Sequence, residues 1–297
     1  MKPAPFAYHR AHSVGEAVAL LAELGDEAKI LAGGLSLVPM MNFRLARPAA
    51  LIDVTRIEGL SYLRADPDGP NGGDGLRIGA LTTHRTVEVS RDPAVLAGFG
   101  VLPRSARWIG HYPIRSRGTF GGSIAHADPA SEWCLLALLL GAQVLLTGPD
   151  GQRTVAAAEF FQGYYTTSAR LDEMITELWF PRPAPHAVLT EFAQRQGDFA
   201  VVAAAVSVDI GGGACRSGRV VLGGVGPVPA QIDASALAGQ LASAETWRAM
   251  GEHAAGQIDP PDDTHGSSEY RRRLTATLVT RALAQASVLV QAGQDRG

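Results

Sequence analysis

The first part of the chain alternates amphipathic segments with short apolar ones. A Ser-x-x-Glu capping box opens a run of apolar residues at helical spacing over 13–24, and Gly25 is placed to end that helix. Apolar segments at 28–32 and 51–54 predict short strands. Between them, Gly33-Gly34 breaks the chain before a helix predicted over 35–45. The order of helix, strand, glycine turn, helix and strand indicates a mixed α/β lobe.

The middle of the chain predicts a second lobe of strands and helices. Residues 116–124 carry three glycines, so we expect no helix there. Asp150-Gly151 predicts a hairpin turn, and the stretch 66–75, rich in Gly, Pro and Asp, predicts an exposed loop. The expected strands are 76–80, 142–146 and 174–180, and the expected helices are 86–90, 94–107 and 132–140.

A proline-rich stretch, Pro181–Pro185, divides this region from the last third. The apolar pattern beyond it predicts three strands followed by helices, which suggests a small antiparallel α+β domain. The expected strands are 188–193, 203–210 and 220–225, and the expected helices are 234–241, 245–255 and 269–292.

Composition and charge exclude several classes of function. The 297 residues are 46% hydrophobic and 19% charged, as in ordinary globular proteins. The net charge is −3 and no basic stripe is present, so we expect no nucleic-acid binding. Two cysteines cannot hold a four-cysteine iron–sulfur cluster. The apolar run 134–140 is too short to span a bilayer, and residues 1–10 do not resemble a secretory signal, so a cytoplasmic location is expected.

Two similar glycine motifs are the strongest chemical signal. "AGGLSL" spans Ala32–Leu37 and "TFGGSI" spans Thr119–Ile124. Paired glycines let backbone N–H groups approach an anion, and a serine hydroxyl adds a donor. Two such loops brought together could hold the two phosphates of a dinucleotide, although each pair alone is more typical of a plain tight turn. The motifs of Rossmann and P-loop sites are absent.

The same stretches resemble the two FAD loops in the flavoprotein subunits of molybdenum hydroxylases. They read "ILAGGLSLVPMM" over 30–41 and "RGTFGGSIAHADPASE" over 117–132. This family includes the medium subunits of carbon monoxide, nicotine and caffeine dehydrogenases and the flavin domain of xanthine dehydrogenase. The resemblance covers nearly the whole chain, with further similar segments at 6–25, 79–88, 195–206 and 267–283.

The resemblance implies an α+β fold. A two-lobed FAD-binding domain of the vanillyl-alcohol-oxidase (PCMH) type would span residues 1–181, with lobes of about 1–57 and 58–181. A C-terminal domain like that of the carbon monoxide dehydrogenase flavoprotein, with three antiparallel strands and helices, would span 186–292. FAD would lie non-covalently between the lobes.

The implied function is electron transfer within an oxidoreductase. The chain would take electrons from a [2Fe-2S] small subunit and pass them to an external acceptor, while a molybdopterin large subunit oxidises the substrate. The assembly would be a dimer of heterotrimers, with the molybdenum cofactor and the clusters on the partner subunits only. The alternatives are a stand-alone FAD-dependent oxidase or reductase of the same fold, and a scaffold subunit without flavin.

The resemblance also implies the site residues. Glu132 takes the place of an acidic residue, often Asp in the family, that hydrogen-bonds FAD. Ile109 and Ile175 take the places of apolar residues beside the flavin, and Thr83 is placed to line the pocket. Each has a plainer structural interpretation: a first-turn helix carboxylate, core packing, or a strand-end hydroxyl. The loop contacts would come from Ala32, Gly33, Gly34, Leu35, Ser36 and Leu37, and from Thr119, Gly121, Gly122 and Ser123.

Some positions differ from the family or stay open. Ala193 stands where some members have a lysine near the flavin, so any ion pair of that lysine is absent unless Arg195 substitutes. Arg115 and Arg117 precede the second loop and could neutralise phosphate or be solvated. Covalent attachment of flavin at His126 is not expected, and neither a catalytic residue nor a metal ligand is expected on this chain.

Overall fold

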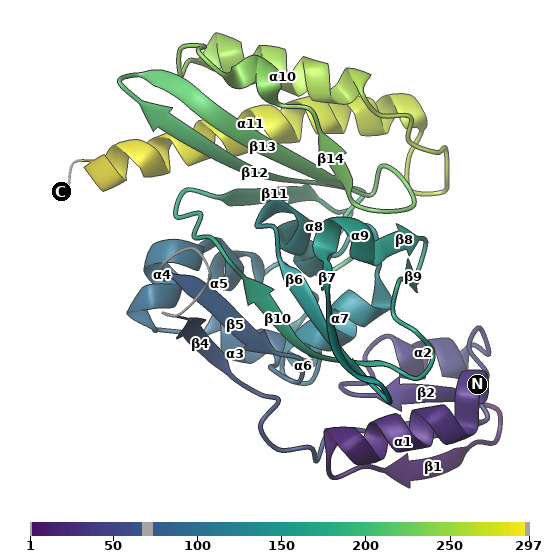
Figure 1. Cartoon of the computed structure of the whole chain (residues 1–297). Coiled ribbons are helices and arrows are strands. Elements are labelled where there is room, and N and C mark those ends of the chain that lie inside the picture. Colours follow the sequence, from purple (N-terminus) through teal and green to yellow (C-terminus); the bar gives the residue numbers. More distant parts are fainter. Residues whose placement is uncertain (1, 67–73, 295–297) are drawn as a thin grey trace.

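The first lobe is a three-stranded parallel sheet with two helices. A computed structural model of the chain describes residues 2–66 and 74–294. The strand order is β1-β3-β2, so the first strand pairs with the third. Figure 1 shows this lobe, in purple, at one end of the molecule. Its elements are β1 (Ala7–Arg10), α1 (Val14–Leu24), β2 (Ala28–Leu31), α2 (Leu37–Asn42) and β3 (Ala50–Asp53).

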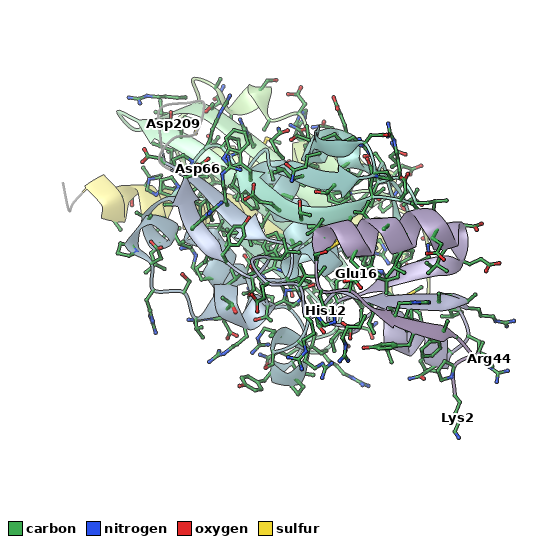
Figure 2. The ribbon with its side chains drawn as sticks, turned by 60° about the horizontal axis from the view of Figure 1, so that its bottom comes forward. Lys2, His12, Glu16, Arg44, Asp66 and Asp209 are labelled. Carbon is green, nitrogen blue, oxygen red and sulfur yellow. The ribbon has the colours of Figure 1, made fainter. Side chains whose placement is uncertain are left out.

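Helix α1 begins where the capping box predicts. The Ser13 hydroxyl accepts a hydrogen bond from the Glu16 backbone N–H at 3.1 Å, and a Glu16 carboxylate oxygen accepts one from the His12 N–H at 2.8 Å. Figure 2 shows Glu16 and His12 close together at this helix end. Gly25, with φ of 60°, ends the helix. The buried face of α1 packs on β3, and Leu21 and Ile52 belong to the same hydrophobic core.

The second lobe is built on a five-stranded antiparallel sheet of order β4-β5-β10-β6-β7. The strands are β4 (Leu63–Asp66), β5 (Gly75–Gly79), β6 (Gln143–Gly148), β7 (Gly151–Ala156) and β10 (Met174–Phe180). The helices are α3 (His84–Glu88), α4 (Pro93–Phe99), α5 (Val101–Ser105), α6 (Tyr112–Arg115), α7 (Phe120–His126), α8 (Glu132–Leu139) and α9 (Ala157–Phe160), followed by the hairpin of β8 (Phe161–Gly163) and β9 (Thr166–Thr167).

The last third forms a four-stranded antiparallel sheet covered by two helices (Figure 1). Along β12, Val202, Ala204 and Val206 pack against the helices, whereas Ala203 and Ala205 join the core of the second lobe. The sheet therefore lies between α8 on one side and the two C-terminal helices on the other. Its elements are β11 (Val188–Phe192), β12 (Val202–Gly211), β13 (Ala214–Gly223), β14 (Ala230–Ile232), α10 (Ala244–Gly256) and α11 (Ser268–Gln294).

The absence of a helix at 116–124 is the clearest wrong prediction, because α7 runs through the second glycine pair. The Thr119 hydroxyl caps α7 by accepting a hydrogen bond from the Gly122 N–H at 3.1 Å. A Cβ on Gly121 would lie 2.6 Å from that of Ala80. Close packing therefore requires glycine at position 121. Glycine makes helix formation less favourable, and the Thr119 cap on the first turn offsets this.

Other boundaries also differ from the sequence predictions. Helix α2 is shorter than 35–45 because Arg44 turns left-handed at φ of 60°. A break at Gly100 divides the helix predicted over 94–107 into α4 and α5. The short strand β14 gives the C-terminal sheet a fourth strand beyond the three expected, and a single 3-10 turn replaces the helix predicted over 234–241. Most of the loop predicted at 66–75 lies outside the described residues.

Candidate functional site

The first glycine loop presents a run of free backbone donors. It connects β2 to α2, and Gly34 adopts φ of 74°. Within the described residues, the five N–H groups from Gly33 to Leu37 donate no hydrogen bond, and the Ser36 hydroxyl has no partner. All six residues from Ala32 to Leu37 are partly accessible. Successive free N–H groups beside a hydroxyl can bind a diphosphate.

The two glycine motifs meet through their main chains. A Cβ on Gly33 would lie 2.3 Å from the carbonyl oxygen of Arg117 and 2.9 Å from the Cα of Gly118. Arg117 and Gly118 lead directly into Thr119, the first residue of the second motif. Segments about eighty residues apart therefore touch, and only glycine at position 33 allows it.

The second motif uses its own donors internally. The N–H of Phe120 donates to the Thr82 carbonyl at 2.8 Å, and that of Gly121 donates to the Ala80 carbonyl at 2.9 Å. The Gly122 N–H is bound to the Thr119 hydroxyl, and the hydroxyls of Ser123 and Ser131 lie 2.8 Å apart. This motif therefore shapes the site by fixing the strand-to-helix turn, while the free donors come from the first loop.

Thr83 and Ile175 lie beside the second motif. Thr83 forms an antiparallel bridge with Thr119, and its hydroxyl also caps α3 by accepting from the Thr86 N–H at 3.1 Å. Ile175 precedes a register shift in β10, where the Thr176 carbonyl accepts from the Ala80 N–H at 3.0 Å. The Ala80 carbonyl in turn accepts the hydrogen bond from the Gly121 N–H, so Ala80 connects β10 to the second motif.

The two arginines before the second motif have different environments. Arg115 pairs with Glu88 at 2.9 Å and donates to the carbonyls of Gly110 at 2.8 Å and Ile109 at 3.3 Å. It therefore braces the segment that holds Ile109, and its guanidinium is already neutralised. The side chain of Arg117 is exposed and forms no ion pair in the described part of the chain, which leaves its charge available beside the first loop.

His126 and Ala193 have ordinary structural surroundings. The ring of His126 lies 5.0 Å, centroid to centroid, from that of Tyr165. Asp128 forms a turn, because its carboxylate accepts from the Ala130 N–H at 2.8 Å. Ala193 is half-buried at the end of β11.

A buried histidine that the sequence did not single out connects these parts. The Nδ1 of His84 accepts a hydrogen bond from the indole N–H of Trp133 at 2.9 Å. The other side of the ring lies against Gly118. The backbone N–H of His84 also donates a hydrogen bond to the Gly118 carbonyl at 3.0 Å. Burial first, and then the charge of Arg115, lower the pKa of His84 to about 4. His84 is thus a neutral spacer between α8 and the second motif.

The His84 environment predicts a loss of stability in mild acid. The unfolded chain binds a proton at the ordinary imidazole pKa of 6.5, whereas the folded chain resists it down to about 4. The free energy of unfolding should therefore fall as pH drops from about 6.5 to about 4. In His84→Gln, whose amide oxygen can still accept from Trp133, this part of the pH dependence should disappear. Urea unfolding at several pH values measures it, and identical profiles for the two proteins would contradict it.

Glu132 begins α8 and faces a second carboxyl group, that of Glu191 in β11. Burial, then the charge of Glu191, and to a lesser degree Asp128, raise the pKa of Glu132 to about 8, although a backbone hydrogen bond opposes the shift. Burial raises the pKa of Glu191 to about 7. Glu191 was not predicted as a site residue, although a carboxylate inside an otherwise apolar strand is a signal that the sequence carries.

Comparison with known proteins gives the family. Residues 4–183 match the model described as the FAD binding domain in molybdopterin dehydrogenase, and residues 187–286 match the CO dehydrogenase flavoprotein C-terminal domain. None of the helices in the described part of the chain combines the length and apolarity needed to cross a membrane.

Individual relatives match over nearly their full length. The chain is 38% identical to the 6-hydroxypseudooxynicotine dehydrogenase complex subunit alpha of Paenarthrobacter nicotinovorans, covering 96% of each. The structure of carbon monoxide dehydrogenase from Hydrogenophaga pseudoflava matches with a TM-score of 0.91 and 36% identity, over 97% of this chain and 99% of that one. Quinoline 2-oxidoreductase from Pseudomonas putida 86 matches with a TM-score of 0.90 and 33% identity, over 96% and 98%. The chain belongs to the FAD-binding medium subunits of the molybdenum hydroxylase family, of the carbon monoxide dehydrogenase flavoprotein type.

Proposed function

We propose that this chain is the electron-transfer subunit of a heterotrimeric molybdenum hydroxylase. It receives electrons from a [2Fe-2S] small subunit and passes them through FAD to an external acceptor, while a molybdopterin large subunit oxidises the substrate. The observation that carries the proposal is the run of five free N–H groups at Gly33–Leu37, held against Arg117 and Gly118. This is the donor set that a diphosphate needs, and it fits FAD.

The residues of the chain would bind and orient the cofactor. The N–H groups of the first loop and the Ser36 hydroxyl would bind the diphosphate, and the exposed Arg117 would neutralise part of its charge. Ile109 and Ile175 would provide apolar contacts for the ring system. Bound FAD supplies the chemistry, which is storage of two electrons and their release to a second acceptor. Thr83, which pairs with Thr119, and the second motif would keep the first loop and the apolar residues in fixed positions around the cofactor.

The wider arrangement follows from the same proposal. The FAD-binding domain comprises residues 1–181 and the C-terminal domain residues 186–292. FAD is bound non-covalently, and the complex is a dimer of heterotrimers in the cytoplasm. Two buried free thiols, Cys134 and Cys215, are compatible with a reducing compartment. The substrate is chosen by the molybdenum-containing partner, and Ala193 leaves the flavin without the lysine that some relatives have.

Purification from the native host tests the proposal. The chain should copurify with two other subunits, and the complex should contain molybdenum, iron and FAD, with the visible absorption bands of oxidised flavin. The purified chain alone should bind added FAD without oxidising the substrate of the complex.

Two outcomes would contradict the proposal in different ways. Steady turnover of a small alcohol by the isolated chain would favour a stand-alone oxidase. A colourless chain that fails to bind added FAD would favour a scaffold subunit.

A further inference from the structure

Glu191 points from the C-terminal sheet toward the FAD-binding domain. Side chains alternate along β11: the Thr190 hydroxyl donates to the Leu278 carbonyl in α11 at 3.1 Å, and Phe192 packs edge-on against Tyr270. Leu189 instead joins the core that contains α8. Glu191, two residues from Leu189, therefore faces the same side.

Strand register places Glu191 near the beginning of α8. Glu191 pairs with Ala203, which pairs with Gly223. A Cβ on Gly223 would lie 2.8 Å from the carbonyl oxygen of Pro129 and 2.7 Å from a methyl carbon of Leu135. This row of residues thus crosses the sheet over the first turn of α8, which Glu132 opens.

Neither carboxyl group has a cation beside it among the described residues, and a hydrogen bond from the Glu132 backbone is the one contact that favours its charged form. The Oε2 atom of Glu191 is completely buried and accepts no hydrogen bond. Within the described residues, neither Glu132 nor Glu191 forms an ion pair or a hydrogen bond to another side chain. The other ionisable groups around Glu132 are Asp128 and the thiol of Cys134, neither of which can offset negative charge. The neighbours in the strand row carry no charge.

Two partly buried carboxyl groups without cations retain protons to higher pH than exposed ones, because ionising both would place like charges together in a poorly solvated site. Such a pair titrates as a unit. A carboxyl group kept neutral can donate an O–H hydrogen bond, whereas a carboxylate can only accept. The state of the pair therefore decides which kind of atom Glu132 can bind.

We propose that Glu132 and Glu191 form one proton-sharing carboxyl pair across the domain junction, in which Glu191 is a positioning residue that keeps Glu132 protonated. Glu132 then donates a hydrogen bond to an acceptor of FAD, a carbonyl oxygen or a ring nitrogen. This inference rests on the proposed function, because the contact between Glu132 and FAD is itself part of that proposal. Ionisation of the pair removes the donor and places negative charge beside the cofactor.

The dissociation constant of FAD from the full chain, measured at pH 6–10 by quenching of flavin fluorescence, tests the pair. The wild-type constant should be steady near pH 6 and rise about tenfold between pH 8 and pH 9. Glu132→Gln, a neutral donor of similar shape, should bind FAD with no such pH dependence. In Glu191→Gln the weakening should begin at lower pH, because the neighbouring carboxyl group is gone. Glu159→Gln, at an exposed carboxyl group of α9, should behave as wild type.

A flat wild-type profile, or a profile that survives in Glu132→Gln, would overturn the inference. Infrared spectra of the unliganded full chain distinguish failure of the carboxyl pair from failure of FAD binding. The C=O band of protonated carboxyl groups should be present at pH 6, diminish by pH 10, and be weaker in each Gln variant. If FAD does not bind at any pH, the proposed function fails. If the band does not change with pH, the carboxyl pair fails.

Discussion

Replacing Gly33 by alanine is expected to weaken FAD binding by about 100-fold or more, which corresponds to roughly 2.7 kcal/mol. The new Cβ would lie 2.3 Å from the Arg117 carbonyl oxygen. Because that contact joins two main chains, no side-chain rotation can relieve it. The two loops must move apart, and the free N–H groups of residues 33–37 then no longer point together at the diphosphate. Titration of the purified chain with FAD, followed by flavin fluorescence, measures the loss.

Gly15→Ala is the matched control for this substitution. Gly15 lies in α1, and a Cβ there would meet no atom within 4 Å. Alanine should leave FAD affinity unchanged and stabilise the helix by about 0.5–1 kcal/mol. If Gly33→Ala binds FAD as tightly as Gly15→Ala, the convergence of the two loops is not what forms the site.

Arg271→Ala is expected to lower the free energy of unfolding by about 2–4 kcal/mol, mainly because two carbonyl groups lose their donor, while the Asp263 side chain is 41% exposed and its charge stays solvated. Arg271 lies in α11, and its side chain is 5% exposed. It donates to the carbonyls of Val201 at 2.5 Å and Gly224 at 2.7 Å, and it pairs with both oxygens of Asp263 at 2.6–2.7 Å. Alanine would leave the two carbonyls without their donor and the carboxylate unpaired. Chemical denaturation of the full chain measures the change.

Arg273→Ala provides the comparison within the same helix. Arg273 pairs with Glu269 one turn away, and their side chains are 68% and 78% exposed. Such a pair contributes less than about 0.5 kcal/mol. The hydrogen bonds from Arg271 are also the main cause of the lowered pKa of Asp263. The stability that this interaction adds is therefore fully present at pH values above the ordinary carboxyl pKa. It is lost as pH falls through the lowered pKa of Asp263 in the folded protein. Equal destabilisation by the two substitutions would contradict the role of Arg271.

The sequence predicted most elements with a strong periodic pattern, because local spacing determines them. Helices α1, α8 and α11 and strand β10 begin and end within a few residues of their predictions. The strands β1, β4 and β14 were missed, since each is a short strand at the edge of its sheet and carries little pattern. Helix α7 was missed for another reason. The helix cost of Gly121 is local, whereas the contact with Ala80 that requires a glycine is tertiary.

The candidate site divides in a similar way. The glycine motifs could be identified from the sequence, because a turn without Cβ atoms leaves a local signature. The closeness of Gly33 to Arg117 could be expected only as a consequence of the resemblance. His84 and Glu191 were missed because their importance depends on Trp133 and Glu132, which are distant in the sequence. The FAD contacts of individual residues stay predictions.

The position of α8 constrains how this chain can vary. Six of its eight residues are buried, including Trp133, Leu135 and Leu136, because the C-terminal sheet covers the side that the FAD-binding domain leaves open. Gly223 touches α8 so closely that a methyl group there would collide with Leu135. A chimera that exchanges the last third between two relatives must therefore have matching residues on α8 and on the C-terminal sheet where the two meet. The FAD-binding domain and the C-terminal domain are therefore expected to have changed together during evolution.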